Sequence, residues 1–348
     1  MDVYLPAYVL VMMKRNVVRA IMLAGLIALA LLEPAAVTAA ARQACRVWAE
    51  SVMPALFPFV TLSLLLVSSL NAWDGADALL TGLTIALGML GGSPSGARLL
   101  AQRAADGRLS RRTAQCAAAC ITTASPMFIL AALTNWLGGG RSIGLTMLAA
   151  HELAALLTGA VCLSWTRRWP DVIPANSNLN HNSTTKSADH AIQMTKSKPL
   201  SLGEAVTQAA SAMLTVCGCM MIFSAAVAVA VKRLSLPESS AAILAAILEM
   251  AGGSARIAAL GWPIVISAPI ICAVVTFGGC SVFAQNASFL SKAGVRIEVQ
   301  LAARVVAGAL AWALCSGMLG NRWGWVAASG ILVAASCVRA EYRRILPT

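Results

Sequence analysis

Residues 90–96 read LGGSPSG and residues 277–281 read FGGCS, and both stretches interrupt apolar segments. The two glycine pairs lie 187 residues apart, and so do Gly107 and Gly294 further along the chain. A helix broken inside a bilayer leaves backbone donors and acceptors without partners, which is tolerated only where protein or a water-filled cavity supplies them. A matched pair of such breaks is typical of the central binding site of a transporter.

The composition places the chain in a membrane. Of its 348 residues, 59% are hydrophobic and 11% are charged, and the mean hydropathy is +0.76. A soluble domain has about 25% charged residues, and a membrane-spanning helix needs about 20 mostly apolar residues. Windows of this kind predict about eight crossings, at 17–32, 80–100, 116–137, 143–165, 205–231, 264–290, 301–319 and 323–338.

Two further apolar stretches, 53–70 and 240–260, are shorter or interrupted. The first contains two prolines, and the second contains Glu249 and a pair of glycines. We interpret both as re-entrant hairpins. The expected fold is an all-α polytopic membrane protein with about eight transmembrane helices and two hairpins. It is expected to be internally duplicated, with one glycine-broken helix per half.

The chain divides at a polar loop rich in Asn, Ser, Lys and Pro, which has almost nothing to bury. The N-terminal order of basic, apolar and small residues also describes a cleavable signal peptide, but we favour an uncleaved first span. The expected units are an N-terminal span and connector (1–41), a first membrane half (42–166), the flexible loop (167–200), a second membrane half (201–340) and a basic tail (341–348).

The net charge of +12 does not indicate nucleic-acid binding. The cations lie mainly in short loops between apolar segments, as the positive-inside rule predicts, whereas a phosphate-binding surface needs a contiguous basic face. The ten cysteines lie mostly in apolar windows and are interpreted as packing residues. We expect no metal and no cofactor beyond a coupling proton or cation. The expected partners are membrane lipid and a small-molecule substrate, while the oligomeric state and the relative sense of the halves stay open.

The first glycine pair begins a candidate substrate site formed by Gly92, Ser93 and Ser95. Proline removes a backbone donor and glycine weakens a helix, so unwinding is expected here. The helix that resumes has a partly positive N-terminus, which suits an anionic group. Arg98, about one turn further, could pair with a carboxylate or be structural. The alternative for the whole segment is a close helix contact through small residues.

The second glycine pair is followed by polar side chains on the resumed helix. Gly279, Ser281, Gln285 and Asn286 are predicted to contribute to the same substrate site. Amide side chains within an apolar span are costly unless they are paired, so they face protein, a cavity or a substrate. Hydrogen bonding between helices is the alternative.

Glu249 is the one carboxylate deep within the apolar windows of the second half, and Ser254 follows it. A buried carboxylate in a membrane is a functional candidate, because it can take up a coupling cation or proton or accept hydrogen bonds from a substrate. We include both residues in the candidate site. If the segment is shallow, Glu249 is instead solvated at the tip of the hairpin.

Thr122, Thr123 and Ser125 form another polar interruption and complete the candidate site. Their hydroxyls could equally bond back to their own helix. His151 and Glu152 begin a metalloprotease helix motif, but its second histidine is missing because position 155 is alanine. His151 is therefore interpreted as a helix-packing or gating residue.

The order of these motifs resembles the YlbJ (SpoVV) family of sporulation integral membrane proteins over residues 45–340. That family belongs with proteins that carry the nucleoside-recognition or Gate domain, and it is distantly similar to concentrative nucleoside transporters. Where the family usually has two asparagines, this chain has Thr122 and Thr123. The resemblance is carried by GGSPSGAR (91–98), ASPMFIL (124–130), EMAG (249–252) and FGGCSVFAQ (277–285).

The resemblance implies a multi-pass protein of the bacterial cell membrane or of the mother-cell-derived forespore membrane, which moves dipicolinic acid into the developing spore. By analogy, the glycine breaks would be unwound helices that meet at the substrate, opposite hairpin tips. We expect a secondary transporter that works by alternating access at a midplane site. The alternatives are a transporter of nucleosides or other metabolites, and a non-transporting sporulation membrane assembly protein. No enzyme is expected, because the sequence has no paired acidic motif, zinc ligand set or nucleophile–base pair.

Overall fold

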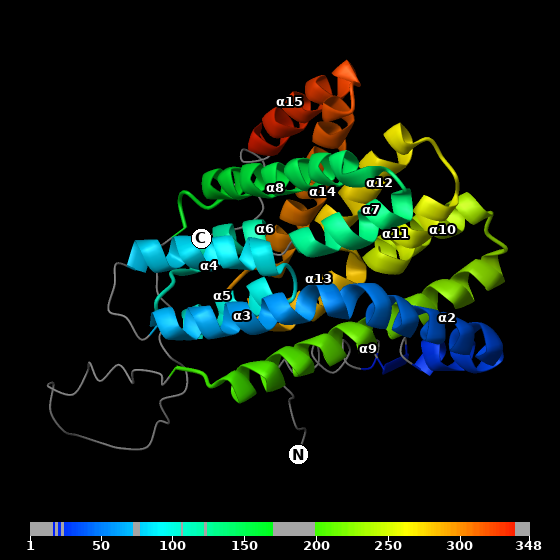
Figure 1. Ribbon diagram of the computed structural model, residues 1–348, viewed down its shortest axis with the longest axis horizontal. Helices are drawn as coiled ribbons and strands as arrows, with labels where there is room; N and C mark the ends of the chain where they lie inside the picture. Colours follow the sequence, from blue (N-terminus) through cyan, green and yellow to red (C-terminus); the bar gives the residue numbers. More distant parts are fainter. Residues whose placement is uncertain are drawn as a thin grey trace, which may run out of the picture.

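The computed structural model describes residues 17, 20–21, 24–71, 77–105, 107–121, 124–169 and 199–337. Its regular structure over these ranges is helical (Figure 1). Most of the predicted polar loop, the predicted basic tail and part of the predicted first span lie outside the described residues. Thr122 and Thr123 lie outside them as well.

The part of the chain before the polar loop begins with a nearly continuous long helix. Two short helices, an interrupted helix and a second long helix follow it. The elements are α2 (Pro34–Val47), the π-helical turn η1 (Trp48–Val52), α3 (Met53–Asn71), α4 (Asp77–Gly91), α5 (Ser95–Ala105), α6 (Arg111–Ile121), the π-helical segment η2 (Phe128–Leu133), α7 (Thr134–Leu137) and α8 (Gly140–Trp165).

The part after the loop has its elements in a similar order: a long helix, two short helices, an interrupted helix and further long helices. The elements are α9 (Leu202–Leu234), α10 (Glu238–Leu248), α11 (Met250–Ala259), α12 (Ile264–Phe277), α13 (Gly279–Lys292), α14 (Ile297–Met318) and α15 (Arg322–Cys337). In Figure 1, α3 runs beside α9 on one side of the molecule, and α8 runs beside α12 and α14 on the other. The short helices lie between these two groups.

Several helical stretches are long and apolar enough to cross a membrane, which confirms the prediction of a polytopic all-α membrane protein. Four of them coincide with predicted windows, and the described residues do not bear out the full number of eight. The helix α15, at 16 residues, is shorter than a typical span. Among the described residues, the five candidate spans are Pro34–Ser69, Gly140–Trp165, Leu202–Leu234, Ile264–Lys292 and Ile297–Met318.

The predicted glycine-broken span at 80–100 is instead a helical hairpin, so this prediction is wrong. A Cβ atom added at Gly96 would lie 3.2 Å from the Cα atom of Gly88, whereas a straight helix separates residues eight apart by about 12 Å. Helices α4 and α5 therefore fold back on each other. They pack closely because neither glycine has a side chain. The turn between them contains Gly92, whose φ is +65°.

The predicted hairpin at 53–70 is also wrong, because α3 is one unbroken helix over this range. Its first proline, Pro54, follows η1, where the amide of Met53 bonds to the carbonyl of Trp48. Pro54 has no backbone N–H to donate. The π turn shifts the hydrogen-bond pattern at this point, so the helix continues past the missing donor. Pro58 lies inside the helix, where a proline removes one hydrogen bond and bends the chain without reversing it.

Residues 240–260 form the helical hairpin that the sequence predicts. A Cβ atom at Gly253 would lie 2.7 Å from the carbonyl carbon of Ala245, so α10 and α11 are in close contact. Glu249 lies between them in an extended conformation, with φ −140° and ψ 112°. Gly253 faces α10 and permits the close packing of the two helices. Glu249 forms the tip of the hairpin.

Candidate functional site

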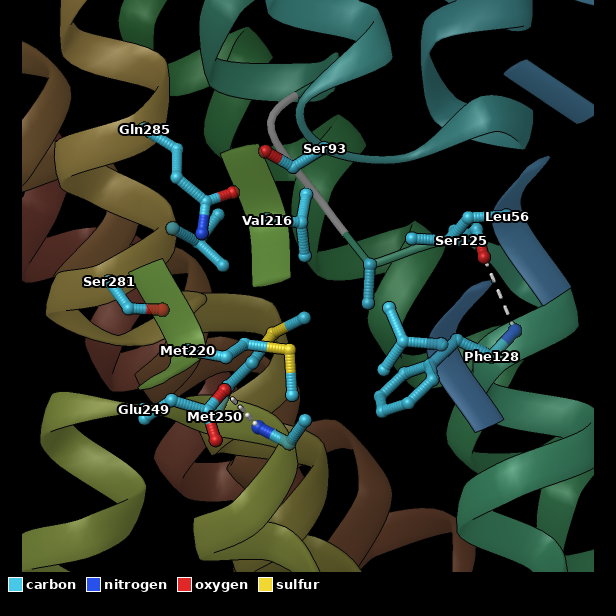
Figure 2. Close-up of a pocket in the computed structure, with 14 residues that line it drawn as sticks. Leu56, Ser93, Ser125, Phe128, Val216, Met220, Glu249, Met250, Ser281 and Gln285 are labelled. Atoms are coloured by element: carbon cyan, nitrogen blue, oxygen red, sulfur yellow. Dashed lines mark hydrogen bonds between the residues drawn. The ribbon is translucent and has the colours of Figure 1, made fainter. Parts of the chain in front are cut away.

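A narrow pocket lies where the two hairpin tips meet the two interrupted helices (Figure 2). In Figure 2, Ser281 and Gln285 from α13 face Ser125 and Phe128 across it. The apolar part of the lining includes Val52, Leu56, Phe128, Val216 and Met220. Five of the predicted site residues line the pocket, namely Ser93, Ser125, Glu249, Ser281 and Gln285.

The tip of the first hairpin packs directly on the backbone of the first interruption. A Cβ atom at Gly92 would lie 2.5 Å from the amide nitrogen of Ser125 and 3.0 Å from the carbonyl carbon of Ala124. Only a residue without a side chain fits between these two backbone segments. The positive φ of Gly92 adds a second reason for glycine at this position.

The second hairpin meets the second interruption in a similar way. Gly278 and Gly279 both have positive φ angles, +90° and +69°. A Cβ atom at Gly279 would lie 3.2 Å from the amide nitrogen of Met250, which is the first residue after the hairpin tip. Each hairpin tip therefore touches the interruption in the helix that follows it in the chain.

Several helices begin at the pocket, and their caps differ. The Oγ of Ser125 accepts a hydrogen bond from the amide of Phe128 at 3.2 Å, so Ser125 followed by Pro126 restarts the first interrupted helix as an N-cap followed by proline at N1. Glu249 caps α11 through the amides of Ala251 and Gly252. Helix α13 has no side-chain cap, so its first backbone amides are donors that no side chain satisfies.

Some of the buried side-chain polar atoms that have no hydrogen-bond partner lie at or next to this pocket. They include the Oγ atoms of Ser254 and Ser281, the Nε2 of Gln285, which has the Cys219 thiol as a neighbour, and the Oδ1 of Asn286, whereas others, such as those of Gln115 and Glu152, belong to residues that do not line the pocket. The exposed fraction of Ser254, Ser281, Gln285 and Asn286 is 5% or less. A buried polar atom without a partner costs about 1–3 kcal/mol. At the pocket, a bound molecule would be able to reach such atoms and complete their hydrogen bonds.

The remaining predicted site residues lie next to the pocket or outside the described chain. Ser95 donates to the carbonyl oxygen of Gly92 at 2.7 Å and closes the turn of the first hairpin. Asn286 donates through Nδ2 to the Oγ of Ser93, which joins α13 to that hairpin. Ser254 lies about one turn into α11, behind the tip. Whether any predicted site residue binds substrate stays a prediction.

Arg98 has a structural role in this geometry. Its Nη1 donates to the carbonyl oxygen of Gln208 at 2.9 Å, and its guanidinium lies 6.0 Å from the ring centroid of Phe289. These contacts join α5 to α9 and α13. Arg98 is absent from the pocket lining, so the structure favours the structural alternative for this residue.

His151 on α8 joins the two interrupted helices. Its Nε2 lies 3.2 Å from the carbonyl oxygen of Ala124, and its Nδ1 lies 2.7 Å from the Oγ1 of Thr276. The carbonyl can only accept, so Nε2 carries the proton in this bond. Ala124 belongs to the first interruption, and Thr276 immediately precedes the second. This agrees with the interpretation of His151 as a helix-packing residue.

Arg304 and Gln300 on α14 also contact the ends of the interrupted helices, and the sequence interpretation missed both. The Nε2 of Gln300 donates to the carbonyl oxygen of Ala118 at 3.1 Å. The Nη1 of Arg304 donates to the carbonyl oxygen of Thr276 at 3.1 Å. Arg304 is the one charged residue in the window 301–319, so the signal was present as an ionisable group inside an apolar span.

Replacing His151 by phenylalanine is expected to lower the melting temperature of the purified protein. The substitution keeps an aromatic ring of similar size but removes both hydrogen bonds, at a cost of about 2 kcal/mol. Scanning fluorimetry in detergent measures the change. Leu153→Phe is the matched control, because Leu153 is 38% exposed on the same helix. Equal melting temperatures for the two variants would show that His151 does not hold the interruptions together.

Comparison with known proteins supports the family resemblance. The chain is 27% identical over 313 residues, covering 80% of its own length and 76% of the relative, to the sporulation integral membrane protein YlbJ of Bacillus subtilis strain 168. No family model matches the chain, and no solved structure matches it. The relative and the apolar helices together identify the chain as an integral, multi-pass membrane protein.

Proposed function

We propose that this protein belongs to the YlbJ family of sporulation integral membrane proteins, one of which it resembles at 27% identity, and that it is a secondary transporter of a small organic anion. The observation that carries the proposal is the set of buried polar atoms around the pocket that have no hydrogen-bond partner. Each of these atoms lowers the stability of the fold unless a bound molecule supplies its hydrogen-bond partner. A transported ligand would supply their partners for part of the cycle.

The donors at the pocket fit an anionic group. The hydroxyl of Ser281 is a buried donor without a partner among the described residues, and the amide of Gln285, beside the thiol of Cys219, is a second buried donor that lines the pocket. They lie on α13, whose uncapped N-terminus carries partial positive charge. A carboxylate bound there would accept hydrogen bonds from the side chains and from the first backbone amides of the helix.

The apolar lining fits a flat organic body. Phe128, Val216 and Met220 line the pocket together with the polar groups. A planar ring would pack against these side chains while its substituents reach the donors, as is usual for small-molecule pockets. Dipicolinic acid, an aromatic ring with two carboxyl groups, combines both features. Its transport into the developing spore is the specific function that we propose.

Transport would use two repeated units, each made of a hairpin and the interrupted helix that follows it. We propose that the units lie within the membrane halves at 42–166 and 201–340. The hairpin tip at 91–95 then corresponds to Glu249, and the interruption at 124–125 corresponds to Gly278. This pairing replaces the correspondence between the two glycine pairs. Movement of one unit against the other would give alternating access to the pocket.

A charged Glu249 would repel an anionic substrate, since its exposed fraction is only 2% and it lies at the same pocket. We propose that Glu249 takes up a proton together with the substrate. Binding of the anion and neutralisation of the carboxylate would then favour each other, as linkage requires.

Uptake of labelled dipicolinate into proteoliposomes that contain the purified protein tests the proposed function. We expect saturable uptake that unlabelled dipicolinate inhibits and uridine does not. Liposomes without protein are the control. Uptake of uridine with competition between the two would favour a nucleoside transporter. No uptake of either molecule would favour a non-transporting role in a membrane assembly.

A further inference from the structure

Arg304 has contacts that the substrate site does not explain. Its exposed fraction is 2%, it lies within the candidate span α14, about two turns from the start of the helix, and it is absent from the pocket lining. Its Nη1 donates to the carbonyl oxygen of Thr276, at 3.1 Å, and its Nη2 donates to the carbonyl oxygen of Ala119. One guanidinium therefore bonds to the ends of two helices that are far apart in the chain.

Both carbonyl groups belong to helix ends at an interruption. Ala119 lies in the last turn of α6, and Thr276 lies in the last turn of α12. The last carbonyl groups of a helix have no partner within the helix, and together they carry partial negative charge. In transporters with broken helices, such ends commonly bind a coupling sodium ion or proton. The same chemistry would accept any compact positive group.

Neighbouring side chains complete a polar layer at this crossing. Gln300 bonds to Ala118 in the same last turn of α6, and His151 bonds to Ala124 and to the side chain of Thr276. These hydrogen bonds of Gln300 and His151 end on α6, on α12 or on the first interruption. Arg304 supplies the positive charge of the layer. The layer lies between the ends of α6 and α12, and it adjoins the substrate pocket at Ala124.

We propose that Arg304 is a built-in cation at the crossing of the two interrupted helices. Its guanidinium takes the place that an alkali metal cation would take between the carbonyl ends of α6 and α12. Arg304 is thus a positioning residue that fixes the spacing of the two interruptions. The inference deepens the proposed transport function, and its statement about transport rests on that function. If the protein is a transporter, no alkali cation binds at this crossing during the transport cycle.

The first consequence concerns the dependence on ions. The melting temperature of the wild-type protein is expected to be the same, within about 1 °C, in sodium, potassium and choline chloride at equal ionic strength. Dipicolinate uptake is expected to proceed equally in the three salts. A wild-type protein that gains several degrees in sodium alone, or that takes up dipicolinate only in sodium, would overturn the proposal.

Variants separate the charge of Arg304 from its hydrogen bonds. Lysine keeps the positive charge but loses the planar fork, whereas glutamine keeps donors without the charge. We expect Arg304→Lys to melt about 10 °C above Arg304→Gln. A glutamine variant as stable as the lysine variant would show that hydrogen bonds alone are needed, and would overturn the cation role.

Chemical rescue gives a readout that a merely structural role would not move. Adding guanidinium at millimolar concentration is expected to raise the melting temperature of Arg304→Ala by several degrees. Arg256→Ala, which removes an exposed arginine on α11, is the control and should not respond. No rescue beyond the control overturns the proposal. If Arg304→Ala cannot be purified, the comparison of lysine with glutamine decides the question.

These stability measurements do not depend on the proposed function. If the wild-type protein takes up no dipicolinate but Arg304→Ala is rescued by guanidinium, the transport proposal fails and the cation role stands. If uptake occurs and depends on sodium, transport stands and the cation role fails.

Discussion

Replacing Gly92 by alanine is expected to abolish transport and to lower the melting temperature more than any other single substitution considered for this protein. The new Cβ atom would lie 2.5 Å from the amide nitrogen of Ser125, closer than real Cβ contacts occur. The neighbour is backbone, so no rotamer change relieves the clash. The φ of +65° adds about 1–2 kcal/mol for a residue with a side chain. The hairpin tip would have to leave the first interruption.

Gly261→Ala is the matched control for Gly92→Ala. Its φ is +68°, but nothing lies within 4 Å of an added Cβ atom. This variant should lose only the conformational cost, about 1 kcal/mol, and keep its uptake activity. Melting temperature and proteoliposome uptake measure both variants. If the two variants behave alike, the contact between the hairpin tip and the interruption does not matter for the fold or for transport.

Replacing Glu249 by alanine has the second-largest expected effect. The carboxylate accepts hydrogen bonds from the amides of Ala251 at 2.9 Å and Gly252 at 2.6 Å. Removing it leaves two amides without an acceptor at a buried hairpin tip, which costs about 4 kcal/mol. We expect loss of uptake and a lower melting temperature. Glu238→Ala, at the exposed start of the same hairpin, is the control.

Glutamine at position 249 separates the cap from the charge. Its amide oxygen can still accept one of the two backbone bonds, so the fold should survive. Wild-type uptake is expected to rise as the pH on the substrate side falls, because protonation of Glu249 removes the repulsion of the anion. Uptake by Glu249→Gln should not change with pH over the same range. A pH dependence identical to that of the wild type would exclude Glu249 as the proton-binding group.

The sequence predicted the positions at which helices are interrupted more reliably than the path that the chain takes after each interruption. The glycine pairs at 91–92 and 278–279 both end a helix, as predicted. Whether the chain then reverses or continues depends on packing across the bundle. Gly88 and Gly96 let α4 and α5 fold back, whereas α12 and α13 form a single candidate span. The first motif contains Pro94 and the second contains no proline, but a proline alone does not predict a reversal, because Pro58 lies inside an unbroken helix.

The polar residues of the site were easier to predict than its architecture. Amides, hydroxyls and a carboxylate inside apolar windows are costly in a membrane, so their presence indicated the pocket. The apolar wall could not be predicted, because Val216 and Met220 on α9 have no local feature that distinguishes them from other core residues. Arg304 was missed although the same reasoning applies to a charge within a span.

Isothermal titration of the purified protein with dipicolinate tests the central claim most directly, namely that the buried donors at the pocket bind an organic anion. The comparison is between the wild type, a Ser281→Ala/Gln285→Leu double variant, and Ser291→Ala, which alters an exposed serine on the same helix. We predict one site in the wild type and in Ser291→Ala, with affinity about 100-fold or more weaker in the double variant. No binding by the wild type at millimolar dipicolinate, or equal affinity in all three proteins, would contradict the account.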